Sequence, residues 1–96
     1  YLKIKETVCR LYGVKEADLF ILRRGITNEP RNIAIFLMRH FKGSKLDEIG
    51  REFDIRKYSS VSTIIERTKQ RAIKDRKFKK RIEEIKLDLK VSQEQT

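Results

Sequence analysis

The sequence contains few of the residues that build disulfides, metal sites and membrane spans. It has one cysteine, Cys9, and one histidine, His40, so it can form neither an internal disulfide nor a cysteine-based zinc site. Its longest unbroken apolar run is six residues, at positions 33–38, which is far too short to cross a bilayer. We therefore expect a cytoplasmic protein that uses no metal, cofactor or membrane partner. Cys9 is expected in the core, and His40 at the surface or in helix packing.

The start of the sequence lacks two further features. Tyr1 stands where a complete chain would carry methionine, and no secretion signal follows it. We expect the chain to be a piece of a longer protein. Its 96 residues are enough for one small domain and too few for two.

Acidic residues are scarce relative to basic ones. The chain has 24 Lys and Arg against 14 Asp and Glu, which gives a net charge of +10. Such an excess is typical of nucleic-acid binders when the bases cluster, although a merely soluble basic protein would share it. The densest cluster runs from Arg67 to Arg81, with nine bases and the single acid Asp75. This cluster is either a phosphate-binding patch or an ordinary solvated helix face.

Apolar residues recur at helical spacing in six segments, and no segment shows the alternation of a half-buried strand. The predicted fold class is all-α, with about six helices. These helices are expected at residues 2–12, 15–22, about 29–42, 44–53, 58–72 and 76–89, with a frayed tail after residue 89. In the second of them, we expect Ala17, Leu19 and Phe20 to be buried.

Capping residues support several of these boundaries. Residues 28–30, Asn-Glu-Pro, have the order typical of a helix start. Gly43 would end the third helix in a left-handed conformation. Ser44 with Asp47 resembles a capping box for the fourth helix, and Asp75 is a candidate N-cap for the sixth.

The last predicted helix has a narrow apolar stripe between highly charged flanks. Its members, spaced 4, 3 and 4 residues apart, are Phe78, Ile82, Ile85 and Leu89. One interpretation of the chain is therefore a helical interaction module, in which this stripe pairs with a partner or with itself.

The most informative segment is LDEIGREFDIRKYSSVSTIIER, residues 46–67. It predicts two short amphipathic helices joined by a tight turn. Ile49 and Phe53 lie on one face of the first helix, and Gly50 beside them allows close packing. The buried face of the second helix would consist of Val61, Ile64 and Ile65. This pattern is typical of a helix-turn-helix, whose second helix enters the DNA major groove with its N-terminal end.

The start of that second helix holds residues that reach phosphates or base edges and that suit a core poorly. They are Arg56, Lys57, Tyr58, Ser59 and Ser60. Ser59 could also cap the helix, and the Tyr58 ring could instead be half-buried and brace the turn. One turn further on, Ser62 and Thr63 face either the groove or solvent.

Three motifs in this order, PRN with IAIFL, LDEIGREF, and IRKYSSV, resemble the C-terminal DNA-binding domain of the bacterial replication initiator DnaA. In that family the corresponding stretches read like PRQ with an apolar run, LPEIG with a later F, and GRDHTTV. The resemblance covers about residues 2–71 and implies a DnaA-type helical bundle. It also implies that Arg24, in the basic loop at Arg23-Arg24, enters the minor groove and that Arg31 contacts the DNA backbone.

The chain departs from that family at positions that would touch bases. Lys57 and Tyr58 replace an Asp-His pair. Asp47 stands where a proline is usual, and residues 59–60 are serines in place of threonines. Asp accepts a hydrogen bond from cytosine, whereas Lys donates to guanine or to phosphate. A changed target sequence is therefore expected.

The KYSSVS block and the basic stretch KDRKFKKRIEEI resemble more closely the DnaA-like domain at the C-terminus of REP-associated tyrosine transposases. That resemblance implies a separate catalytic domain, with a His-apolar-His metal motif and a nucleophilic tyrosine, upstream of Tyr1. The predicted function is a noncatalytic, sequence-specific DNA-binding module for duplex DNA or a hairpin repeat. The alternatives are a replication-initiator-like or regulatory DNA-binding protein, and the helical interaction module.

The predicted organisation has two parts within one domain. Residues 1–72 form the helix-turn-helix DNA-binding domain, with a recognition helix at about 58–72, and residues 73–96 add a basic helix and tail. The residues predicted to bind DNA are Arg23, Arg24, Arg31, Lys45, Arg56, Lys57, Tyr58, Ser59, Ser60, Ser62, Thr63 and Arg67.

Overall fold

The computed structural model describes residues 2–21 and 27–94 and confirms the all-α fold class. Its elements are α1 (Leu2–Tyr12), the short 3₁₀ helix η1 (Glu16–Phe20), α2 (Glu29–Lys42), α3 (Leu46–Glu52), α4 (Tyr58–Lys74) and α5 (Arg76–Glu94). The described ranges contain no strand. The expected helices therefore all form, with the second one as a 3₁₀ helix.

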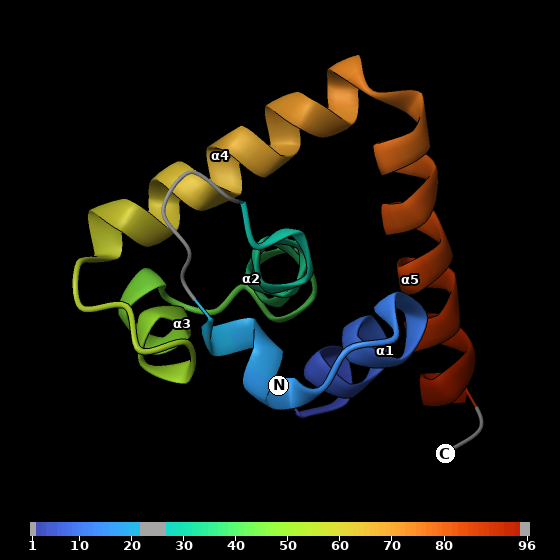
Figure 1. Cartoon of the computed structure of the whole chain (residues 1–96), viewed down its shortest axis with the longest axis horizontal. Helices are drawn as coiled ribbons and strands as arrows, with labels where there is room; N and C mark the ends of the chain where they lie inside the picture. The colour runs from blue at the N-terminus through green and yellow to red at the C-terminus, as the bar shows by residue number, and fades with distance from the viewer. Residues whose placement is uncertain (1, 22–26, 95–96) are drawn as a thin grey trace.

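Helix α2 is the centre of the domain. In Figure 1 it is seen end-on, with α4 above it, α3 to one side and α1 and α5 on the other. Helices α1, α3 and α4 pack directly on α2, whereas α5 packs on α1 and α4. A helix surrounded in this way needs apolar residues on most of its circumference, which the run IAIFLM provides. The buried residues of α2 are Ile33, Ala34, Ile35, Leu37 and Met38.

Three of the predicted capping features are confirmed. The Asn28 side chain accepts a hydrogen bond from the backbone N–H of Arg31 at 3.2 Å and begins α2. Asp75 Oδ1 accepts from the backbone N–H of Phe78 at 3.1 Å and begins α5. Gly43 ends α2 with a left-handed φ of 59°, a conformation that carries no steric cost for glycine.

The predicted capping box at Ser44 and Asp47 is wrong. Helix α3 begins at Leu46 and has Lys45 as its N-cap residue. The Lys45 backbone is extended, and its side chain makes no capping hydrogen bond. Ser44 is buried one residue before the cap, and its carbonyl accepts a hydrogen bond from Arg39 Nη1 at 2.7 Å. Through this hydrogen bond to Arg39 of α2, Ser44 stays outside α3. The predicted capping box therefore starts one residue too early.

Two expectations for η1 are also wrong. Leu19 is buried as expected, but Ala17 and Phe20 are exposed, and the Phe20 side chain is 43% accessible. A 3₁₀ helix has three residues per turn, so a five-residue segment presents only a narrow face to the core. Position 22, the expected end of this helix, lies outside the described residues.

Helix α5 corrects the interpretation of its apolar stripe. Phe78, Ile82, Ile85 and Leu89 are all buried in the core of the domain. A one-residue break at Asp75, which has an extended backbone, folds α5 back beside α1 (Figure 1). The stripe is therefore not available to a partner, and the helical interaction module is excluded on this surface. The helix also continues to Glu94 where a frayed tail was expected after Leu89.

Candidate nucleic-acid interface

The helix-turn-helix is held together by a close backbone approach at Gly50. A Cβ atom at this position would lie 2.6 Å from the carbonyl oxygen of Ile55 and 3.6 Å from Cγ2 of Val61. The Ile55 N–H donates to the Gly50 carbonyl at 2.8 Å, which folds the turn onto the end of α3. Asp54 takes the left-handed conformation at φ 56° that the turn requires. The close packing predicted at Gly50 is confirmed. The atom nearest to a Cβ at this position belongs to the backbone of the turn.

Lys5 fixes the C-terminal end of α3, a role that sequence reasoning missed. Its ammonium group lies 2.9 Å from Glu52 Oε2 and donates to the Glu52 carbonyl at 3.3 Å. It also lies over the rings of Phe20 and Phe53, at 5.6 and 5.2 Å from their centroids. A cation at a helix C-terminus stabilises the free carbonyls there. Lys5 therefore ties the first helix of the motif to α1, although in sequence it resembles any surface lysine.

The N-terminal end of α4 is polar and exposed. Residues 56–60 are all exposed, and the Tyr58 side chain is 65% accessible, so it does not brace the turn as a half-buried ring. Lys57 occupies the N-cap and makes no side-chain cap, so Ser59 lies in the first turn and is not the N-cap. The first N–H groups of a helix have no intrahelical partner and attract anions. This end of α4 can therefore bind phosphate or base acceptors.

Several predicted residues share one flank of α4. A hollow of about 280 Å³ is lined by Ser59, Ser60, Thr63, Ile64 and Arg67. Thr63 Oγ1 donates its hydrogen to the Ser59 carbonyl at 2.9 Å. Toward a ligand, this hydroxyl can therefore only accept a hydrogen bond. Ser62 is exposed but does not line this hollow.

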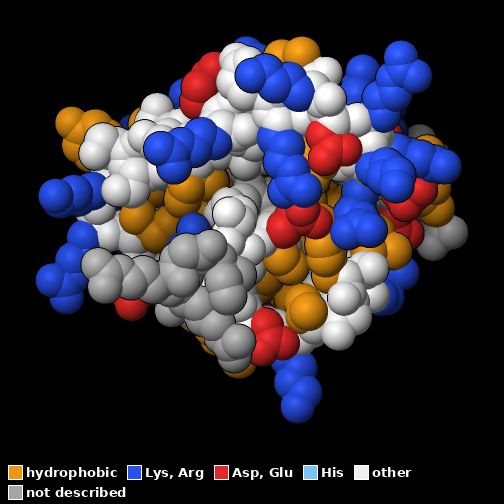
Figure 2. Space-filling view, turned by 45° about the horizontal axis from the view of Figure 1, so that its top comes forward, with side chains coloured by type: hydrophobic (Ala, Val, Ile, Leu, Met, Phe, Trp, Pro, Cys, Tyr) orange, Lys and Arg blue, Asp and Glu red, His pale blue; other side chains and the backbone are white. Residues whose placement is uncertain are grey.

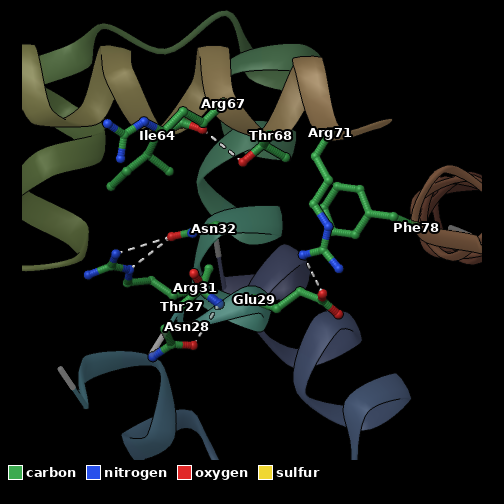
Figure 3. Close-up of a pocket in the computed structure, with 10 residues that line it drawn as sticks. All are labelled: Thr27, Asn28, Glu29, Arg31, Asn32, Ile64, Arg67, Thr68, Arg71 and Phe78. Carbon is green, nitrogen blue, oxygen red and sulfur yellow. Dashed lines mark hydrogen bonds and ion pairs between the residues drawn. The ribbon is translucent and has the colours of Figure 1, made fainter. Parts of the chain in front are cut away.

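A second pocket, of about 330 Å³, joins α4 to the start of α2 (Figure 3). Arg31 lies across it from Arg67, which lines both this pocket and the hollow on α4. Nε and Nη2 of Arg31 donate to Asn32 Oδ1 at 3.2 and 3.1 Å, and burial lowers the pKa of the Arg31 guanidinium. The tertiary structure thus brings Arg31 to the same surface as the start of α4.

Other predicted residues lie elsewhere. Lys45 lines a separate hollow near the end of α2, together with Lys42 and Glu48. Arg56 lines a further hollow with the carboxylates of Asp47 and Asp54. The predicted minor-groove pair at positions 23 and 24 lies outside the described residues.

The comparison with known proteins agrees with this geometry. A family model described as the bacterial DnaA protein helix-turn-helix matches residues 2–68. The chain belongs to this family. The chromosomal replication initiator protein DnaA of Aquifex aeolicus (strain VF5) is 35% identical over 79 residues, which are 81% of this chain and 20% of that protein. The chain therefore spans about a fifth of the length of this relative. Family membership makes it a DNA-binding domain of helix-turn-helix type, and such a domain is not catalytic.

The basic cluster of this DnaA-type domain, Arg67 to Arg81, is not uniformly available to DNA. Figure 2 looks onto the face that carries α4 and shows Lys and Arg side chains with acidic ones between several of them. Arg71 Nη1 lies 2.6 Å from Glu29 Oε1, and Arg81 Nη1 lies 3.3 Å from Glu29 Oε2. Glu29 thus pairs with two arginines of the basic cluster. The sequence did not predict these ion pairs, because an acid in the first turn of a helix is already explained by the helix dipole.

The remaining candidates of the DnaA-type domain have structural roles. Cys9 is buried, and burial raises the pKa of its thiol. His40 is exposed and stacks on Phe36, with Phe41 at its edge. Within residues 2–21 and 27–94, no three His, Cys, Asp or Glu side chains are grouped as metal ligands would be. No helix in these ranges combines the length and apolar character needed to cross a membrane.

Proposed function

We propose that this domain binds duplex DNA sequence-specifically, with the N-terminal end of α4 in the major groove. The observation that carries the proposal is the exposed run 56–60 at an uncapped helix start, directly after the tight turn at Gly50. α4 is 17 residues long, about 25 Å at 1.5 Å per residue, so it is longer than the width of a major groove, about 12 Å.

A second group of contacts would bind the phosphate backbone of the DNA. Arg31 and Arg67 meet across the pocket between α2 and α4, beside the hollow that contains Ser60. Guanidinium groups bind phosphate in bidentate fashion, and such contacts set register and carry no sequence information. We include the basic loop at positions 23 and 24 in this group on the family resemblance, as the minor-groove contact.

The reading residues favour a target that differs from the family's usual one. Lys57 donates to guanine O6 or N7, whereas the aspartate usual at this position accepts from cytosine. Tyr58 carries a hydroxyl in place of an imidazole, and the two serines keep hydroxyls without the methyl groups that could contact thymine. We infer that the fold is kept while the recognised sequence is changed.

The longer protein to which the domain belongs has two candidate identities. The 35% identity to a replication initiator favours an initiator-like DNA-binding protein. The KYSSVS block and the basic start of α5 favour a REP-associated transposase. A Gly-rich phosphate-binding loop upstream of Tyr1 would support the first, and a His-apolar-His pair the second. In both, residues 1–72 supply the DNA contacts, and residues 73–96 complete the same domain through the buried stripe of α5.

Selection of bound sequences from a random duplex pool at fixed salt tests the major-groove assignment. Lys57→Ala and Tyr58→Ala should each change the enriched motif, since one good base contact discriminates by about 1–3 kcal/mol. Lys90→Ala, an exposed lysine near the end of α5, is the matched control and should leave the motif unchanged. If both α4 variants enrich the wild-type motif, α4 does not read the bases.

The salt dependence of affinity tests the backbone contacts. Arg67→Gln should weaken binding to all sequences alike and flatten the log–log salt slope by about 0.9, the value of one phosphate contact. Lys90→Gln should leave the slope unchanged. A wild-type slope near zero would contradict DNA binding by this domain altogether.

A further inference from the structure

We propose that Glu29 limits the sequence-independent DNA affinity of the domain by withholding Arg71 from the phosphate backbone. The inference rests on the DNA binding proposed above and adds to it a residue that opposes binding. It concerns the sequence-independent part of the affinity, which comes from cations that neutralise phosphates.

Glu29 is held rigidly by three other helices. Its carboxylate lies 2.6 Å from Arg71 Nη1 of α4 and 3.3 Å from Arg81 Nη1 of α5, and it accepts a hydrogen bond from the Tyr12 hydroxyl of α1. The Glu29 side chain is only 22% accessible. Burial and the contact with Glu29 raise the pKa of the Tyr12 hydroxyl, so this group stays protonated and keeps donating. Such a carboxylate does not move away when DNA approaches.

Arg71 lies where a phosphate contact would otherwise be expected. It follows Arg67 by four residues on the same flank of α4, and both line the pocket with Arg31 (Figure 3). Arg67 forms no ion pair within the described part of the chain. The Arg71 guanidinium instead pairs with Glu29 at 2.6 Å and more loosely with Asp75 at 3.8 Å, and it stacks on the Phe78 ring, 4.0 Å from its centroid. The two arginines thus share a flank and differ in their neighbours, and Glu29 supplies the closer of the two carboxylates that pair with Arg71.

The consequence is a smaller electrostatic contribution to binding and a larger share for base contacts. An ion-paired guanidinium that is stacked on a ring would have to lose both contacts before it could bind phosphate. Glu29 also places a negative charge at the pocket that the DNA backbone approaches. Both effects weaken binding to every sequence, while the base-reading end of α4 is unaffected. The ratio of specific to non-specific affinity is unchanged, and the absolute affinity for non-specific DNA falls.

Glu29→Gln is the direct test, because it keeps the size of the side chain and its acceptor for Tyr12 while removing the ion pairs of Glu29 with Arg71 and Arg81. Binding is measured against salt, with the duplex enriched from the pool and with a scrambled duplex of the same length. We expect the slope to steepen by about 0.9 and the scrambled duplex to gain affinity about threefold more at 50 mM than at 200 mM salt. Glu83→Gln removes the same charge from an exposed residue of α5 that pairs with Lys86, and should change the affinity for neither duplex. Equal behaviour of the two variants would overturn the proposal.

Arg71→Gln provides a test that does not depend on the stability of the Glu29 variant, since it leaves Glu29 with Tyr12 and Arg81. In the wild-type background it should leave the salt slope unchanged, because Arg71 is already withheld. In the Glu29→Gln background it should remove the added slope. If Arg71→Gln alone flattens the slope by about 0.9, Arg71 already contacts phosphate and Glu29 does not withhold it.

The Arg67→Gln variant distinguishes a failure of the role proposed for Glu29 from a failure of DNA binding itself. Arg67→Gln should flatten the slope whatever Glu29 does, so a normal Arg67 effect with no Arg71–Glu29 coupling contradicts only the role of Glu29. A wild-type slope near zero contradicts both.

Discussion

The two ends of α4 use basic and polar side chains in opposite ways. At the N-terminal end, residues 56–60 extend into solvent, no side chain caps the helix, and the nearest packing is the turn onto Gly50. At the C-terminal end, Arg71 is paired with Glu29 and stacked on Phe78, and Asp75 ends the helix and caps the next one. One end is free to meet a ligand, and the other is part of the structure that holds the domain together.

The difference shows that formal charge and available charge are separate quantities. Both ends lie in a stretch where bases outnumber acids. The sequence distinguishes Arg71 from Arg67 by Asp75, four residues after Arg71, and these two side chains lie 3.8 Å apart. A guanidinium acts on a distant ligand only to the extent that no nearer carboxylate neutralises it, because the interaction energy falls with distance. We infer that Glu29, 42 residues before Arg71, is the nearer carboxylate that limits what Arg71 contributes to DNA binding.

The largest test of this comparison is Phe78→Ala at the C-terminal end. The variant should lose about 3–5 kcal/mol of unfolding free energy, because a buried ring is replaced by a cavity and Arg71 loses its stacking partner. Urea denaturation followed by circular dichroism measures the loss. Tyr58→Ala at the exposed end is the control and should stay within about 0.5 kcal/mol of wild type. Equal losses would mean that the two ends are packed alike.

Gly50→Ala tests how the exposed end is held. The added Cβ would meet the Ile55 carbonyl at 2.6 Å, and the displaced turn should cost about 1–3 kcal/mol of stability. Since the turn places the start of α4, the affinity for the selected duplex should fall as well. Gly43→Ala provides the contrast. It should cost about 1–2 kcal/mol through its left-handed φ of 59°, with no Cβ clash, and should keep DNA affinity in the folded fraction. Full DNA affinity in folded Gly50→Ala would show that the turn does not position α4.

The smallest expected effect concerns the caps at the two ends. Asp75→Ala should cost about 1 kcal/mol, because the Phe78 N–H loses its acceptor at 3.1 Å. Ser59→Ala should cost only a few tenths of a kcal/mol, because Ser59 lies inside the first turn and is not the N-cap. Thermal melts of both variants, at equal protein concentration, measure the difference. A larger loss in Ser59→Ala would restore the capping role that the structure denies.

Much of the fold could be predicted from the sequence because the relevant signals are local. Asn28, Gly43 and Asp75 act on backbone groups within four residues, and each was placed correctly. Ser44 was misplaced because a contact from Arg39 of the preceding helix overrides its local pattern. Phe20 was misjudged because periodicity does not distinguish a 3₁₀ turn from an α-helical one over five residues.

The candidate site was predictable to a similar extent. The exposed run at the start of α4 was expected, since polar residues that suit a core poorly follow a helix-turn-helix pattern directly. The meeting of Arg31 with Arg67 across a pocket was not expected from spacing, because 36 residues separate them along the chain. Neither Lys5 nor Glu29 gave a signal, since a single charged residue on a helix is ordinary on any surface.

The sequence by itself determined the helices, most of their ends, and the helix-turn-helix with its polar leading edge. These features follow from a period of 3.6 residues and from hydrogen bonds that close within one turn. Only the tertiary structure decided that the α5 stripe is core, that Lys5 fixes α3, and that Arg71 is paired with Glu29 while Arg67 has no ion pair among residues 2–21 and 27–94. Each of these depends on which distant side chain comes within a few ångströms of another, and the packing of α2 against its neighbours sets those distances.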